Sequence, residues 1–131
     1  MTEIEKTEKI TINLGPVDLG QIDLLVQEGF YSNRTDFIRT AIRTQIATHA
    51  DVVKRTITRK TLVLGVQHYT RQDLETVRAT GETLYINVLG LVSIAEDVSP
   101  ELALATISAI EVLGAFRASA AVKAALAGRI R

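Results

Sequence analysis

The sequence contains no cysteine among its 131 residues, which excludes disulfide bonds, thiolate metal sites and thiol nucleophiles. It has no apolar run of about 18 residues, the length that a membrane-spanning helix needs. A charged-then-apolar leader is also missing, so we expect a cytoplasmic location. Its 15 basic and 15 acidic side chains leave no net charge, and 47% of its residues are hydrophobic. The chain can therefore bury a real core, and two small domains fit its length.

Residues suited to catalysis or to cofactor binding are equally scarce. Only His49 and His68 are available as nitrogen ligands, which argues against a transition-metal site. No G-x-G-x-x-G or P-loop motif supports nucleotide binding. Asp97 and Glu101 have no nucleophile or histidine nearby and are better explained as loop and first-turn helix acids. We therefore expect no enzyme, no metal and no cofactor, although a small ligand between structural repeats stays open.

Residues 9–14 alternate between polar and apolar side chains, the pattern of a strand with one buried and one exposed face. A lone strand is unstable in water, and no neighbouring strand precedes the helical patterns that follow. Pairing with the same strand of a second copy would give an antiparallel two-stranded ribbon. Such a ribbon fits the major groove of DNA. Its exposed face would carry Lys9, Thr11 and Asn13.

Two helical patterns follow the strand. Gly15-Pro16 ends it, and residues 17–27 have apolar side chains at helical spacing before a glycine at position 29. Ser32 or Asn33 is a suitable N-cap for a second helix that runs to about residue 48. The apolar stripe of this second helix consists of Phe37, Ile38, Ala41, Ile42 and Ile46.

The segment from Glu8 to about Thr48 resembles the ribbon-helix-helix repressors of the Arc, MetJ and CopG type. Three strings carry the resemblance: K-I-T-I-N-L, I-D-x-L-V-x-x-G, and the quite specific Y-S-N-R-T-D-F-I-R-x-A-I-R. The match covers roughly a third of the chain. It implies an obligate, intertwined dimer whose ribbon faces base edges with Lys9, Thr11 and Asn13. It also implies phosphate anchoring at Ser32, Asn33, Arg34 and Thr35, and a dimer core of Ile10, Ile12, Leu14, Phe37, Ile38 and Ile42.

Each of these positions also has a simpler explanation. Lys9, Thr11 and Asn13 would be merely a solvated strand face if the two helices were absent. With the helices present, base contact is the better hypothesis: Asn13 matches adenine, Lys9 matches guanine, and the Thr11 methyl group matches a thymine methyl. Ser32 and Asn33 serve as helix caps in either case, so phosphate contact would be an additional role. Arg34 is either a phosphate contact or a solvated first-turn residue.

Residues 34–60 contain seven basic and two acidic residues, which gives this segment a local charge of 7 − 2 = +5. Dimerisation doubles this local field, which favours attraction of phosphates despite the neutral total. Residues 50–60 contain neither proline nor glycine and form the boundary to the second half. Two structures are open for this segment: an extension of the second helix, or a strand that leads into the second half. Its basic side chains either contact the DNA backbone or are simply solvated.

A short repeat marks the second half. The string V-L-G begins at positions 63, 88 and 112, and each copy is followed by a helical pattern, at residues 70–79, 99–107 and 119–127. One strand and one helix per repeat predict a small stacked array with a parallel sheet. The alternative is a chance repetition in an α/β domain of ordinary topology. Because a three-stranded sheet has two open edges, edge pairing or face packing between subunits is expected.

These observations predict an α+β protein with a ribbon-helix-helix domain at residues 1–50, a basic connector at 51–60 and a strand-helix repeat domain at 61–131. The hypothesis is a sequence-specific transcriptional regulator of double-stranded DNA, most simply a repressor, located in the cytoplasm at the nucleoid. It would act as a dimer that assembles further through its C-terminal half, with no membrane partner. An antitoxin whose C-terminal half binds a toxin, and a plasmid-partition or nucleoid-organising protein, remain as alternatives. The apolar, repeat-patterned second half favours the regulator, because antitoxin tails are usually polar and fold on their partner.

Overall fold

The computed structural model describes residues 7–131, which divide into two compact units, 7–54 and 55–131. The division falls within the segment 51–60. The first six residues of the predicted domain 1–50 lie outside the described part of the chain.

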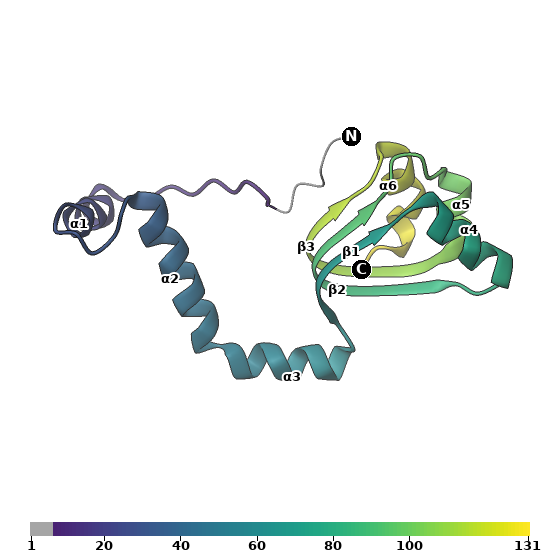
Figure 1. Ribbon diagram of the computed structural model, residues 1–131, viewed down its shortest axis with the longest axis horizontal. Helices are drawn as coiled ribbons and strands as arrows, with labels where there is room; N and C mark the ends of the chain where they lie inside the picture. The colour runs from purple at the N-terminus through teal and green to yellow at the C-terminus, as the bar shows by residue number, and fades with distance from the viewer. Residues whose placement is uncertain (1–6) are drawn as a thin grey trace. The chain divides into compact units, whose positions relative to one another are not determined.

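The first unit contains helices α1 (Pro16–Gln27) and α2 (Arg34–Thr48) (Figure 1). Both lie within a residue or so of the expected ranges. Pro16 occupies the first turn of α1, where its missing N–H costs nothing. Gly29 ends this helix with a positive φ of 86° and donates its N–H to the Val26 carbonyl. The expected glycine C-cap is therefore confirmed.

Helix α2 begins with two reciprocal hydrogen bonds. The Asn33 side chain accepts from the Asp36 N–H at 2.8 Å, and the Asp36 carboxylate accepts from the Ser32 N–H at 2.9 Å. This differs by one residue from a standard capping box, in which the carboxylate would bind the N-cap amide. Asn33, one of the two expected candidates, is therefore the N-cap.

Residues 9–14 form no strand within the single described chain. A strand is held by ladder hydrogen bonds to a neighbour, and no other described segment of this chain pairs with these residues. The predicted ribbon requires a second copy, so it stays a prediction.

Residues 50–60 form a separate helix, α3 (Ala50–Lys60). The strand alternative for this segment was wrong, and the helical alternative is confirmed except that α3 is a separate helix and not a continuous extension of α2. Helix α2 ends at His49, whose φ of −105° and ψ of 18° depart from helical geometry, and α3 starts anew at the next residue. The absence of proline and glycine correctly excluded a flexible linker, but it did not reveal this interruption.

The second unit is built on a parallel sheet of three strands in the order β1-β2-β3 (Figure 1). Its strands are β1 (Val63–Tyr69), β2 (Leu84–Ile94) and β3 (Ile107–Arg117), and each is followed by a helix. These helices are α4 (Arg71–Thr80), α5 (Pro100–Thr106) and α6 (Ala120–Leu126), with a final 3-10 turn at Ala127–Arg129. The expected alternation of strands and helices around a parallel sheet is confirmed.

The V-L-G repeats lie side by side in the sheet. Gly65 is in register with Gly90, and Gly90 with Gly114. All three glycines have φ between 126° and 141°, a region that side chains rarely adopt. A Cβ added to Gly90 would lie 2.1 Å from the Gly65 carbonyl oxygen, and one added to Gly114 would lie 2.0 Å from that of Gly90. The repeat is therefore a structural column in which the second and third glycines permit close approach of the strands.

Helices α4, α5 and α6 pack against one face of the sheet, since all three contribute to a single core. Leu74 of α4, Leu102 of α5 and Leu126 of α6 share this core with Ile86 and Val92 of the central strand. At roughly 25 cal/mol per Å² of apolar surface, burial of each such leucine contributes about 1.5–3 kcal/mol. The unit 55–131 thus has a hydrophobic core of its own.

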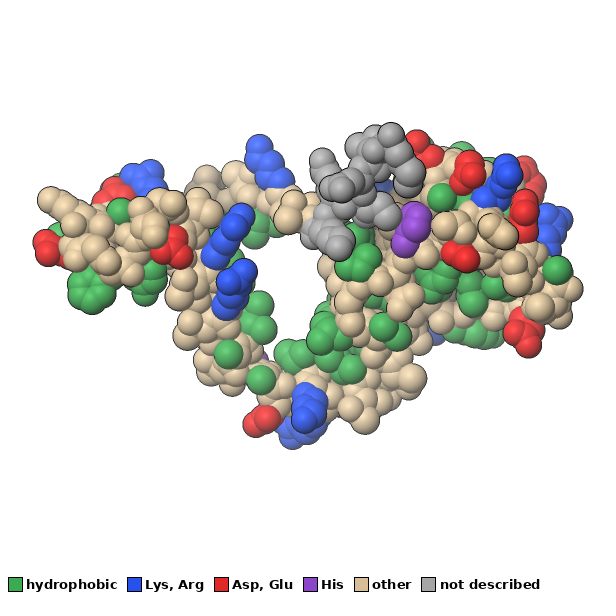
Figure 2. All heavy atoms as spheres, in the orientation of Figure 1, with side chains coloured by type: hydrophobic (Ala, Val, Ile, Leu, Met, Phe, Trp, Pro, Cys, Tyr) green, Lys and Arg blue, Asp and Glu red, His purple; other side chains and the backbone are tan. Residues whose placement is uncertain are grey.

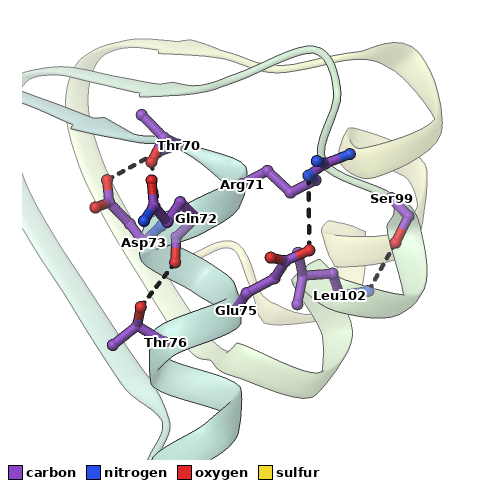
Figure 3. A network of polar contacts seen from close by, with 8 residues as sticks. All are labelled: Thr70, Arg71, Gln72, Asp73, Glu75, Thr76, Ser99 and Leu102. Atoms are coloured by element: carbon purple, nitrogen blue, oxygen red, sulfur yellow. Dashed lines mark hydrogen bonds and ion pairs between the residues drawn. The ribbon is translucent and has the colours of Figure 1, made fainter.

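Polar contacts fix where the helices of this unit begin (Figure 3). At α4, the Thr70 hydroxyl accepts from the Asp73 N–H at 3.1 Å, and the Asp73 carboxylate accepts from the Thr70 N–H at 2.9 Å, a complete capping box. At α5, the Ser99 hydroxyl accepts from the Leu102 N–H at 3.1 Å, beside Pro100 at the first helical position. The expected cap at Ser99 is confirmed.

Among residues 7–131, none of the helices combines the length and the apolar character that crossing a membrane requires.

Candidate nucleic-acid interface

The three residues expected to read bases are exposed in the described chain. Lys9, Thr11 and Asn13 lie in the segment 7–15, in which every residue is exposed. The apolar residues between them are exposed as well, with 75% of Ile10, 58% of Ile12 and 41% of Leu14 accessible. Apolar side chains that are open to water gain stability only when a further surface buries them.

Helix α2 also exposes apolar side chains, and it has no buried residue. Ile42 and Ile46 are 46% and 59% exposed, whereas Phe37 and Ile38 are half-buried. Hydrophobic side chains are visible on the surface of both helices of this unit (Figure 2). Ile22 is the one buried hydrophobic residue in 7–54. A unit with a single buried side chain offsets little of the conformational entropy lost on folding.

The start of α2 offers backbone N–H groups to an anion. Phe37 makes the first bond back, to the Asn33 carbonyl at 3.2 Å, and the Asp36 N–H is taken by the Asn33 side chain. The amides of Arg34 and Thr35 precede these bonds and have no helical acceptor. Together with the positive end of the helix dipole, they form a site that suits a phosphate oxygen. Asn33 itself is committed to capping.

Arg34 has a partner that its place in the sequence did not predict. Its Nε and Nη2 donate to the two carboxylate oxygens of Asp23 in α1, at 2.7 and 2.8 Å. This bidentate pair joins the two helices across the turn, next to an edge-to-face contact between Tyr31 and Phe37 whose ring centroids are 5.0 Å apart. The pairing leaves Nη1 of Arg34 for a further acceptor. The only signal in the sequence was the opposite charge of Asp23, eleven residues before Arg34, and no periodic pattern connects the two positions.

Residues 7–54 carry no net positive charge. Five basic side chains and six acidic ones give 5 − 6 = −1. Most of the acidic residues precede position 34, whereas Arg39 and Arg43 are exposed one turn apart on α2. Lys and Arg side chains appear along α2 and α3 (Figure 2). Attraction of phosphates therefore depends on where the charges lie and not on the total.

The Arg34–Asp23 pair predicts a small pH dependence of stability. The hydrogen bond from Arg34 lowers the pKa of Asp23 below its usual 3.8. Because the folded pKa is the lower one, this stabilisation is fully present above about pH 4 and is lost as the pH falls through the folded value. We expect Asp23→Asn to unfold at lower urea concentration than the native chain at pH 6. The gap should shrink by pH 3, and a gap that is unchanged by pH would contradict this assignment.

Comparison with protein families matches residues 5–123 to the Ribbon-Helix-Helix transcriptional regulator family. No curated protein and no solved structure gave a match. The family match includes the strand pattern, both helices of the first unit, and the sheet up to the start of α6. It thus extends well beyond the segment 8–48 on which the resemblance was first based. The chain belongs to the ribbon-helix-helix transcriptional regulator family, which makes it a DNA-binding regulator.

Proposed function

We propose that this regulator is a repressor whose DNA-reading form is a dimer, with residues 9–14 of two copies paired as an antiparallel ribbon in the major groove. The observation that carries the proposal is the single buried hydrophobic residue of unit 7–54, beside the exposed Ile10, Ile12 and Leu14. Dimerisation gives these side chains a core built from both copies. It also sets the polar residues of the strand on the opposite face, toward DNA.

The chemistry of the polar face suits base edges. Asn13 offers an amide that pairs in a bidentate manner with adenine, Lys9 donates to the guanine acceptors, and Thr11 offers a methyl group to thymine. The two-fold symmetry of the dimer presents this set twice, so the operator is expected to consist of repeated half-sites. Proteins of this family typically have no enzymatic activity, which agrees with a purely binding role.

Phosphate anchoring at the start of α2 supplies orientation without sequence preference. The Arg34 and Thr35 amides bind one phosphate oxygen, and the hydroxyls of Ser32 and Thr35 add donors. Asn33 contributes indirectly, since its side chain fixes the helix start. Arg34 has two roles. Its Nε and Nη2 join α1 to α2 through Asp23, and its Nη1 extends toward the phosphate backbone of the DNA.

The second unit supports the repressor over the antitoxin. Residues 55–131 have their own core, with side chains such as Leu74, Ile107 and Val122 fully buried. A segment that masks a toxin typically folds on its partner, whereas this one is folded in the single chain. We assign residues 61–131 to further assembly of dimers on adjacent half-sites, which raises affinity through effective concentration.

Asn13→Ala tests base reading by the ribbon. With an operator selected from randomised duplexes, the variant should bind more weakly by about 1–3 kcal/mol, while its affinity for unrelated duplexes stays nearly constant. Gel-shift titrations against both kinds of duplex measure this.

Arg34→Ala is the matched control for Asn13→Ala. It should weaken binding to all duplexes alike and make the dependence on salt shallower by about one unit for each phosphate that Arg34 no longer neutralises. If Asn13→Ala left the preference for operator over unrelated DNA unchanged, the base-reading role of Asn13 would be wrong.

A further inference from the structure

The two edges of the three-stranded sheet differ in how they are protected. The outer edge of β3 is partly occupied by the C-terminal residues: Ile130 bridges to Ile110, and the Arg131 N–H donates to the Ile110 carbonyl at 2.8 Å. The Arg129 guanidinium donates to the Ile107 carbonyl at 2.7 Å. Strand β3 also carries two charged residues, Glu111 and Arg117. Covering segments and charges are the devices that prevent edge pairing.

In the described part of the chain, strand β1 has none of these devices. Its sequence, V-L-G-V-Q-H-Y, contains no acidic residue, lysine, arginine or proline. Among the described residues, β2 is the one strand that pairs with β1, so its other edge presents unpaired backbone groups. Val63, Leu64 and Val66 are 46%, 68% and 49% exposed. An apolar edge strand of this kind is a template for another strand.

The glycine column shows that space for a further strand exists. Beside Gly90 and Gly114, the space that a Cβ would take is filled by the backbone carbonyl of the preceding strand. Beside Gly65, which has nearly the same φ of 139°, no atom of the described chain lies within 4 Å of that position. Within residues 7–131, the sheet therefore ends at β1, and no segment takes the next strand position.

We propose that β1 pairs in antiparallel fashion with β1 of a second copy, which joins two three-stranded sheets into one of six strands. A two-fold contact sets each strand against its own copy, so a charged residue near the centre of the strand would lie close to the same charge in the other copy. β1 is free of such charges along its whole length. Full overlap of the two seven-residue strands puts Val66 on the two-fold axis, with Leu64 opposite His68. Mixed sheets with one antiparallel junction are common.

This inference rests on the assembly role proposed above for residues 61–131 and names the surface that performs it. It adds to the ribbon a second self-complementary surface on each chain. The two surfaces belong to different units, so each can be removed without the other.

Because the chain has no cysteine, single introduced cysteines test the register directly. Val66→Cys in the full chain should form a disulfide-linked dimer on mild oxidation. On-axis residues of an antiparallel pair have Cα atoms about 4.5–5.5 Å apart, within the range that a disulfide spans. Leu113→Cys on β3 is the control, since Leu113 and Val66 are each 49% exposed. Cross-linking of Val66→Cys alone supports the proposal. No cross-link at Val66, or an equal yield at both positions, overturns it.

A second experiment separates this surface from the ribbon. The Ile12→Asp chain, which lacks the ribbon contact, should still have the mass of two chains in light scattering. Adding Leu64→Lys, which places a charge at the edge, should reduce the mass to one chain, whereas adding Leu113→Lys should not. A monomeric Ile12→Asp chain would contradict β1 pairing and would leave the proposed DNA-reading ribbon untouched. A Val66→Cys chain that binds its operator but forms no cross-link would likewise contradict β1 pairing and leave the proposed ribbon intact.

Discussion

Ile12→Asp is expected to abolish the folded form of unit 7–54 and, with it, all binding to the selected operator. In the proposed ribbon, Ile12 of each copy lies in the shared core, so the substitution buries two like charges near the two-fold axis. An uncompensated buried charge costs roughly 3–5 kcal/mol, against a total stability of about 5–15 kcal/mol for a typical domain. The measurement is the loss of helical circular dichroism from α1 and α2, together with a gel shift.

Thr11→Asp is the control for this variant, because it makes the same change at the neighbouring position on the opposite face. In the proposed ribbon Thr11 lies on the side opposite the shared core, so the helical signal of the unit should persist. Operator binding should still fall, because the new carboxylate would repel the phosphates of the DNA. If Ile12→Asp kept a native helical signal and melted like Thr11→Asp, Ile12 would not belong to a core.

Gly90→Ala is expected to disrupt the sheet of unit 55–131. A side chain at a φ of 141° costs about 1–3 kcal/mol, and its Cβ would lie 2.1 Å from the backbone oxygen of Gly65. Because the obstructing atom belongs to a hydrogen-bonded strand, the strands must separate to make room. We expect a loss of about 3 kcal/mol or more in the free energy of unfolding, measured by urea denaturation of the full chain.

Gly128→Ala provides the comparison within the same unit. Gly128 lies in the C-terminal 3-10 turn, and a Cβ there would meet no atom within 4 Å. Its substitution should change the free energy of unfolding by less than about 0.5 kcal/mol. Equal effects at positions 90 and 128 would show that the glycine column is not needed for strand approach.

Local signals in the sequence predicted much of this fold. Gly29 ends α1 because glycine readily adopts a positive φ, and Ser99-Pro100 begins α5 because the serine side chain caps the helix and proline suits its first position. The V-L-G repeat predicted parallel strands, and its copies are in register because equal strand-helix units stack with equal spacing. These features depend on neighbours in sequence or on repetition, both of which are visible in a single sequence.

Features that depend on distant contacts were not predictable in the same way. The interruption at His49 separates two helices without any proline or glycine to mark it. The Arg34–Asp23 pair and the bridge between Ile130 and Ile110 join residues whose proximity follows from the turn and from the sheet. The ribbon itself was inferred from alternation at residues 9–14, but no described segment of the single chain pairs with these residues. Its test therefore requires two copies.

The most direct test of the shared ribbon is an isotope-filtered NMR experiment on full-length protein that mixes carbon-13-labelled and unlabelled chains. It detects only contacts between protons of different copies. The account predicts contacts between the methyl groups of Ile10, Ile12 and Leu14 in one copy and residues 9–14 of the other. A spectrum in which these methyl groups contact only their own chain, recorded at concentrations where the protein binds DNA, would contradict it.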